Sequence, residues 1–276
     1  MVTPGLQPPR VQQHPVPPGY QRLLADPEPP PLALSTAALP QLDRRTIRRE
    51  LVVVLLLFPA VATLTAIITL IAEITGSSPG VSIFDGLDPT LAATLQVVYL
   101  AALAGPIALV WYLLGRSGLS FKSIGLDRTH LWRDLLAGVL LMIAVHVLSA
   151  WIGDFLRYAH VPGVYGAQLP IHTSKTAFIV TGVAEALLYG VMEEVVVLGY
   201  LTNRLRGLRW STPAIAIASV ILRGSYHAEY GIGVLEPLVF GALMTVFYLR
   251  TRRLLPVIIG HIGYDIWVTL QVASYL

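Results

Sequence analysis

Long apolar stretches without a single charge constrain this chain more than any other feature. Residues 51–72, 90–115 and 135–153 contain no Asp, Glu, Lys or Arg. As helices, such stretches are long enough to cross about 30 Å of hydrocarbon. Across its 276 residues the chain is 55% hydrophobic and only 13% charged, whereas soluble proteins carry about 25% charged residues. This composition predicts a membrane protein and argues against a nucleic-acid partner.

Further apolar stretches continue to the end of the chain. In order, the stretches cover residues 51–72, 90–115, 135–153, 176–203, 211–227, 230–249 and 254–276. In lipid every backbone polar group must be bonded within the protein, so each stretch is expected to be a helix. The sequence therefore predicts an all-α fold, a polytopic transmembrane helix bundle with about seven spans.

The ends of the chain differ sharply in composition. Residues 1–42 hold 11 of the 20 prolines and no spanning segment, so we expect a disordered Pro-rich tail, or alternatively a Pro-rich ligand for a partner domain. We divide the remainder into residues 43–175, with the first membrane helices and an interfacial segment, and residues 176–276, the expected core. Cysteine is absent, which excludes disulfides, thiol nucleophiles and Cys-based zinc sites.

The basic residues predict the orientation. They gather in the short segments 44–49, 116–133, 204–209 and 250–253, while the alternate connections are poor in Lys and Arg. The positive-inside rule then places the N-terminus in the cytoplasm and the C-terminus outside, with residues 117–132 along the cytoplasmic interface. Seventeen of the 19 basic residues are Arg, a bias that indicates a GC-rich bacterial genome and hence a bacterial cell membrane.

Ionisable residues in the later stretches are functional candidates, because burying them among membrane helices is costly. They are Glu185, Glu193, Glu194, Arg223, His227, Glu229, Glu236, His261 and Asp265. The adjacent acids Glu193 and Glu194 are the sharpest feature, since two neighbouring carboxylates in an apolar helix cannot both be comfortably ionised. Such a pair suits a general base. The alternative is that both are structural ion partners of Arg223.

Two further pairs have helical spacing. Arg223 and His227 are four residues apart, as are His261 and Asp265, so each pair is expected on one helix face. For Glu185 we favour polar packing over a role in a water path. The sequence Glu236-Pro237 predicts a helix kink.

Two chemical accounts fit these residues. In one, Glu193, His227 and His261 bind a divalent metal such as zinc, which activates water. In the other, no metal is used: Glu193 deprotonates a water while His261 and Asp265 stabilise the oxyanion. Both accounts lead to hydrolysis of an acyl bond.

The last four stretches resemble the CPBP intramembrane proteases, also called Abi or CAAX-protease-like and related to the Rce1 CAAX prenyl endopeptidase. That family's motifs are Glu-Glu-x-x-x-Arg, Phe-x-x-x-His and His-x-x-x-Asn or Asp. Glu193-Glu194 fits the first motif, His227 the second, and His261 with Asp265 the third. Two positions depart from the pattern: Leu198 stands where the family has Arg, and Arg223 where it has Phe.

The resemblance implies a catalytic core in the last four spans and a membrane-embedded endopeptidase. In this reading Glu193 and His227 activate water, His261 and Asp265 support the oxyanion or a metal, and Glu194 and Arg223 complete the site. The substrate would be a peptide or a membrane protein in the lipid bilayer. Two alternatives stay open: an ion- or metal-coupled transporter that uses the same residues as a relay, and a non-catalytic scaffold or pseudoprotease.

Overall fold

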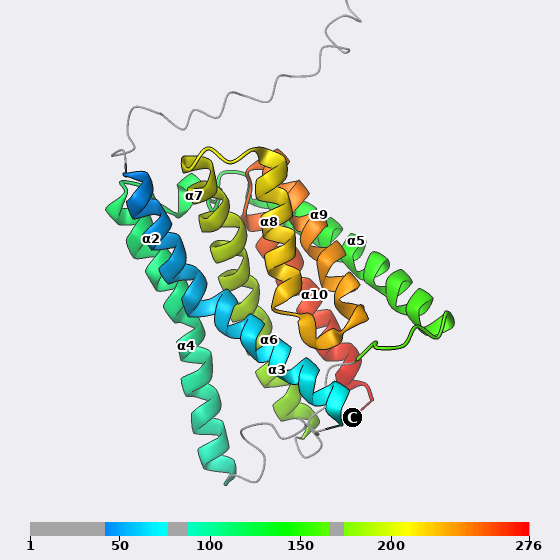
Figure 1. The fold of residues 1–276 in the computed structure, drawn as a ribbon. Coiled ribbons are helices and arrows are strands. Elements are labelled where there is room, and N and C mark those ends of the chain that lie inside the picture. The colour runs from blue at the N-terminus through cyan, green and yellow to red at the C-terminus, as the bar shows by residue number, and fades with distance from the viewer. Residues whose placement is uncertain (1–41, 77–87, 166–173, 276) are drawn as a thin grey trace, which may run out of the picture. The chain divides into compact units, whose positions relative to one another are not determined.

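A computed structural model describes residues 42–76, 88–165 and 174–275 (Figure 1). Within these ranges the chain is helical and has no strand, and the isolated bridge between Val164 and Gly231 is its one β-type pairing. The all-α prediction is therefore confirmed. The predicted Pro-rich tail lies, apart from Leu42, outside the described residues.

The described helices join into seven rods, which correspond to the seven apolar stretches (Figure 1). The first comprises α2 (Arg44–Leu55), the π-helical η1 (Leu56–Ala60) and α3 (Val61–Thr75); the second is α4 (Pro89–Arg116) and the third is α5 (Leu131–Tyr158). The fourth comprises α6 (Lys175–Glu193), the π-helical η3 (Glu194–Leu201) and α7 (Thr202–Gly207); the others are α8 (Thr212–Ser225), α9 (Leu235–Thr251) and α10 (Leu255–Ala273). Short 3₁₀ helices lie between the rods: η2 (Phe121–Ile124), η4 (Ala228–Tyr230) and η5 (Ile232–Val234).

Five helical segments in the described ranges are long and apolar enough to cross a membrane. They are Arg44–Thr75, Thr90–Arg116, Leu131–Tyr158, Ile232–Thr251 and Leu255–Ala273. The apolar helix α8 is shorter, with 14 residues, or about 21 Å at 1.5 Å per residue. The protein is a multi-pass membrane protein, and its orientation remains a prediction.

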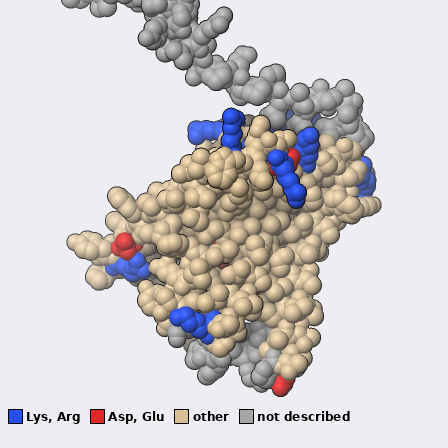
Figure 2. All heavy atoms as spheres, turned by 180° about the vertical axis from the view of Figure 1, so that it is seen from behind, with Lys and Arg blue, Asp and Glu red and all other residues tan. Residues whose placement is uncertain are grey.

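The surface agrees with lipid contact. The face seen in Figure 2 is uncharged over most of its area, and most of the Lys and Arg side chains visible there lie toward the end where α2 begins. Large apolar side chains point outward from several helices, among them Leu64 on α3, Leu140 on α5 and Ile221 on α8. In water such exposure would be unfavourable, whereas in lipid it is the expected arrangement.

Helix α10 lies against both α5 and α6, and small residues allow the close approach. A Cβ added at Gly260 would lie 3.1 Å from the carbonyl oxygen of Gly138 on α5. One added at Gly190 on α6 would lie 2.6 Å from the Ile262 side chain. Glycine at these positions lets membrane helices pack backbone to backbone. This packing brings His261 of α10 beside the Glu193-Glu194 pair of the fourth rod.

The prediction of a kink at Glu236-Pro237 is wrong. Pro237 lies in the first turn of α9, directly after η5. A first-turn proline has no backbone N–H to lose from the helix ladder, so it starts the helix without bending it. The chain does break just before this point, where Gly231 adopts a positive φ of 59° between η4 and η5.

Candidate active site

The two adjacent carboxylates lie at a change of helix type. Glu193 is the last residue of α6 and Glu194 is the first of the π-helical η3. Single π-turns occur frequently at functional sites. Both side chains are buried, with Glu194 fully so. Consecutive helical residues point about 100° apart, and accordingly Glu193 lines a cavity whereas Glu194 is absent from its wall.

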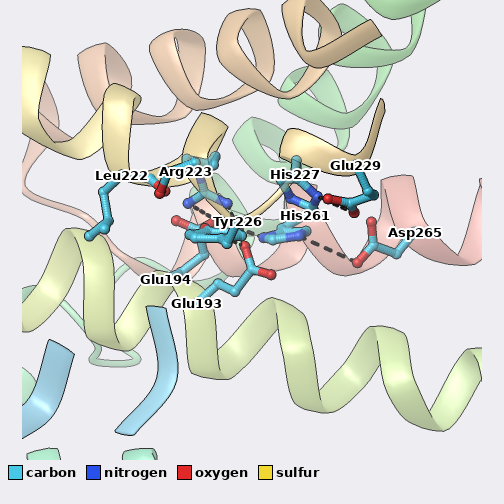
Figure 3. Close-up of polar contacts among 10 residues, drawn as sticks. Glu193, Glu194, Leu222, Arg223, Tyr226, His227, Glu229, His261 and Asp265 are labelled. Atoms are coloured by element: carbon cyan, nitrogen blue, oxygen red, sulfur yellow. Dashed lines mark hydrogen bonds and ion pairs between the residues drawn. The ribbon is translucent and has the colours of Figure 1, made fainter. Parts of the chain in front are cut away.

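Arg223, in the last turn of α8, joins both carboxylates (Figure 3). Its Nη1 donates to Glu193 Oε2 at 2.9 Å, and its Nη2 donates to Glu194 Oε1 at 2.7 Å. The guanidinium is only 1% exposed and packs 5.1 Å from the centre of the Phe240 ring. Gly241 leaves room for it, since an added Cβ there would lie 2.7 Å from the Arg223 side chain. The ion pairing of both acids with Arg223, the alternative raised from the sequence, is therefore present.

His261 lies between two carboxylates. Its Nδ1 is 2.6 Å from Glu194 Oε1, and its Nε2 is 3.4 Å from Asp265 Oδ2, one helical turn further along α10. The Phe240 ring meets the imidazole edge-on at 4.7 Å between centroids. The expectation that His261 and Asp265 share one helix face is confirmed, because both lie within the regular helix α10.

Tyr226 is a site residue that the sequence reasoning missed. Its hydroxyl donates to Glu193 Oε2 at 2.8 Å, the same oxygen that Arg223 binds. The side chain is buried and lines the cavity. The available signal was its place between Arg223 and His227, but spacing alone does not show that a tyrosine hydroxyl meets a carboxylate from another helix.

The expectation that Arg223 and His227 share a helix face is wrong. α8 ends at Ser225, Tyr226 caps it, and His227 has φ −122°. The chain therefore leaves the helix before His227, and i,i+4 geometry does not apply. The His227 ring stacks on Tyr230, with centroids 5.8 Å apart and planes 9° apart. Its Nδ1 lies 3.8 Å from Glu229 Oε1 (Figure 3).

A single cavity of about 1240 Å³ brings these groups together. Of the six residues predicted for the site, five line it: Glu193, Arg223, His227, His261 and Asp265. The first rod and α4 complete the wall, for example through Thr65 of α3 and Pro106 of α4. The cavity therefore extends from the buried charges to helices outside the last four rods.

Glu185 also lies on the cavity wall, two turns before Glu193. It accepts a 2.8 Å hydrogen bond from Gln96 Nε2 on α4, the polar packing that was expected. Nearby, the hydroxyls of Tyr99 and Tyr189 are paired with each other. These contacts connect α4 to α6 beside the buried charges.

The metal-ligand set proposed from the sequence does not assemble in this arrangement. Glu193 is engaged by Arg223 and Tyr226, and His261 by Glu194 and Asp265. Among the residues that the structure describes, no three His, Asp or Glu side chains are placed to hold one ion.

Comparison with known families agrees with the motifs. The sequence model of the family described as Type II CAAX prenyl endopeptidase Rce1-like matches residues 175–267. These residues, about a third of the chain, are similar to that family. Neither the curated proteins nor the solved structures that were compared with the chain include a match. The family is one of endopeptidases, and the matched residues run from α6 into α10.

The matched residues include all six that were predicted for the site, with Tyr226 and Glu229 besides. The first motif lacks its usual arginine here, and the structure shows which residue supplies the positive charge instead. Leu198 is fully buried in the apolar core, while Arg223 supplies the positive charge to the carboxylate pair from α8. The cation comes from a different helix, and both carboxylates still have an ionic partner.

Proposed function

We propose that this protein is a membrane-embedded endopeptidase that hydrolyses a peptide bond with a water activated by Glu193. One observation carries the proposal. Arg223 and Tyr226 both bind Glu193 through Oε2, and no described residue hydrogen-bonds to Oε1. Since Glu193 lines the cavity, its second oxygen is left for a ligand there. A carboxylate held by one oxygen and open at the other suits a general base.

The proposed reaction begins with a water in the cavity giving a proton to Glu193 while its oxygen attacks the substrate carbonyl. The new C–O bond produces a tetrahedral intermediate with a negative oxygen. His261 Nε2–H, on the cavity side and 3.4 Å from Asp265, is the proposed donor to that oxygen. The intermediate collapses by breaking the C–N bond, and the leaving amine takes the proton from Glu193 or through His227.

Glu194 has a different role in this proposal. It is fully buried, lies outside the cavity wall, and contacts both Arg223 and His261. A group that no substrate can reach does not act as the base. We propose that Glu194 is a positioning residue that fixes the His261 ring through Nδ1 and holds the Arg223 guanidinium in place.

The substrate class follows from the surroundings of the cavity. Five of the six proposed residues face a large space between membrane helices, and the outer surface around it is apolar. We propose that a peptide or membrane-protein segment reaches the site from the bilayer.

The test is a digest by the purified protein in lipid nanodiscs, using a pool of peptides and membrane proteins, with cleavage sites identified by mass spectrometry. A general base contributes about 10²–10⁴-fold, so Glu193→Gln should reduce cleavage by that range. The matched control is Glu185→Gln on the same helix and cavity wall, which should stay close to the wild-type rate.

Two further measurements, metal chelation and uptake into vesicles, distinguish a metalloprotease and a transporter from the proposed enzyme. Chelation followed by zinc should leave the rate unchanged if Glu193 acts without a metal, whereas loss and recovery would indicate a metalloprotease. Cleavage that persists in Glu193→Gln would contradict the proposed base. Proton or metal uptake into vesicles that depends on Glu193, without any cleavage, would identify a transporter instead.

A further inference from the structure

His227 is held on a turn that is fixed on several sides. Gly231, with φ 59°, follows η4, and a Cβ added there would lie 2.2 Å from the carbonyl oxygen of Gly163. The backbone N–H of Ile232 donates to that same oxygen at 2.8 Å, and Tyr165 N–H donates to Tyr230 O at 3.2 Å. The turn also packs against α3. His227 therefore has a defined place on the cavity wall despite lying outside a helix.

The plane of the His227 ring is fixed as well. Tyr230 stacks parallel to it at 5.8 Å, and Tyr226 contacts it at 4.9 Å between centroids. Within this arrangement Nδ1 points toward Glu229, at 3.8 Å from Oε1 (Figure 3). Because the two ring nitrogens are on different edges of an imidazole, Nε2 is directed away from Glu229.

Glu229 carries an unusual feature. Its Oε2 is shielded from solvent and has no hydrogen-bond partner among the described residues. Shielded polar atoms in folded proteins are nearly always paired, and an exception calls for an explanation such as a role in catalysis. The side chain lines the cavity together with His227, and each is about one quarter exposed.

The other acidic residues around the cavity have different neighbours. Asp265 faces His261 at 3.4 Å, and Glu193 is bound by Arg223 and Tyr226. Glu236 approaches α5, where a Cβ added at Gly153 would lie 3.0 Å from its Oε1. Within the described part of the chain, Glu229 is thus the carboxylate with an ion-pair contact to His227.

We propose that Glu229 is the positioning residue for His227. Its carboxylate accepts the Nδ1–H, either directly once the 3.8 Å gap closes around a substrate or through one bridging water. This fixes the neutral tautomer in which Nε2 carries the lone pair and is free to accept a proton. A carboxylate behind a histidine has this same function in hydrolytic triads. The inference rests on the proposed peptidase function, in which His227 passes a proton to the leaving amine.

The first test needs no substrate, because it measures the tautomer. The chain has seven histidines, and nitrogen-15 NMR of histidine-labelled protein in detergent separates Nδ1–H from Nε2–H forms, with the His227 signals assigned from His227→Gln. Spectra are taken above about pH 8, where an ordinary imidazole with pKa near 6.5 is neutral. The wild type should show mainly Nδ1–H at His227, and Glu229→Leu should shift it toward Nε2–H. The matched control Glu236→Leu, another acid on the cavity wall, should leave the His227 signals unchanged.

The second test uses cleavage of whichever peptide the digest identifies. Glu229→Leu should lower kcat by at least about 10-fold, but by less than the ~10⁴-fold lost with the orienting aspartate of a serine-protease triad, because the leaving amine can also take its proton from Glu193. Glu229→Asp should recover part of the rate. The double variant Glu229→Leu with His227→Gln should be no slower than His227→Gln alone, because the two groups act as one unit. If Glu229→Leu fails to fold, Glu229→Met, which has a similar length and no carboxyl or amide oxygen, is used in both tests.

The outcomes separate the inference from the function on which it rests. A His227 tautomer that is the same in wild type and in Glu229→Leu overturns the pairing, whatever the activity. A tautomer shift in a protein that cleaves nothing supports the pairing and counts against the peptidase. A normal cleavage rate in folded Glu229→Leu overturns the positioning role even if the tautomer moves.

Discussion

Arg223 donates a 2.9 Å hydrogen bond to Glu193 although the two residues come from different helices, α8 and α6. The same guanidinium reaches Glu194, so one buried cation balances two buried acids. Removing one partner of a buried ion pair typically costs about 3–5 kcal/mol, because the remaining charge is left uncompensated. The position of this arginine is therefore central both to the fold and to the proposed reaction.

Moving the arginine from position 223 to position 198 tests whether the cation can be supplied from the helix that the family usually uses. Arg223→Phe alone should abolish cleavage and lower the thermal midpoint, since Glu193 and Glu194 lose their ionic partner. Adding Leu198→Arg, one turn after Glu194, should recover part of the stability and rate. Thermal unfolding in detergent and the peptide digest measure both. A double variant no better than Arg223→Phe would show that the two positions are not equivalent.

Tyr226→Phe removes a single hydroxyl from the site. The hydroxyl donates to Glu193 Oε2 at 2.8 Å, and hydrogen bonds to charged groups contribute about 1.5–3 kcal/mol. We expect kcat to fall roughly 10- to 100-fold with little change in KM, because the carboxylate is less firmly oriented while the cavity keeps its shape. Tyr230→Phe is the control, since no described hydrogen bond joins its hydroxyl to Glu193. Equal effects of the two changes would argue against an orienting role for Tyr226.

The contribution of Asp127, in the loop before α5, to the stability of the folded protein should be lost in acid. The Thr129 hydroxyl and backbone N–H, together with Arg253, lower the pKa of Asp127 from 3.8 to about 2, against the opposing effect of partial burial. A folded-state pKa below the unfolded value stabilises the folded protein at all pH values above about 4. That stabilisation is lost as the pH falls through about 2. Asp127→Asn should therefore lower the thermal midpoint at neutral pH, and its difference from wild type should shrink as the pH approaches 2.

The topology prediction can be checked by thiol labelling, since the chain contains no cysteine. Single cysteines placed at Arg128, Arg209 and Arg250 should all react with an impermeant reagent from the cytoplasmic side. A cysteine at His160, after α5, should react only from the other side. The reason is that Arg-rich connections stay in the cytoplasm. Labelling of Arg128→Cys and Arg209→Cys from opposite sides would show that the span count is wrong.

The sequence by itself determined what depends on neighbouring residues along the chain. Hydropathy located the seven helical rods, and regular spacing placed His261 and Asp265 together on α10. Both depend only on the local requirement that a backbone in lipid bond to itself as a helix. The adjacent acids Glu193 and Glu194 could also be recognised from the sequence, because burying charges in an apolar membrane helix is costly.

Only the tertiary structure decided which of these groups meet and which way they face. Glu193 faces the cavity, whereas Glu194 does not. The Tyr226 hydroxyl binds Glu193. Helix α8 ends before His227, and His227 therefore faces Glu229. These outcomes depend on how α6, α8 and α10 pack and on where a turn is anchored to residues 163–165. Such contacts join residues far apart in the chain, and no local periodicity encodes them.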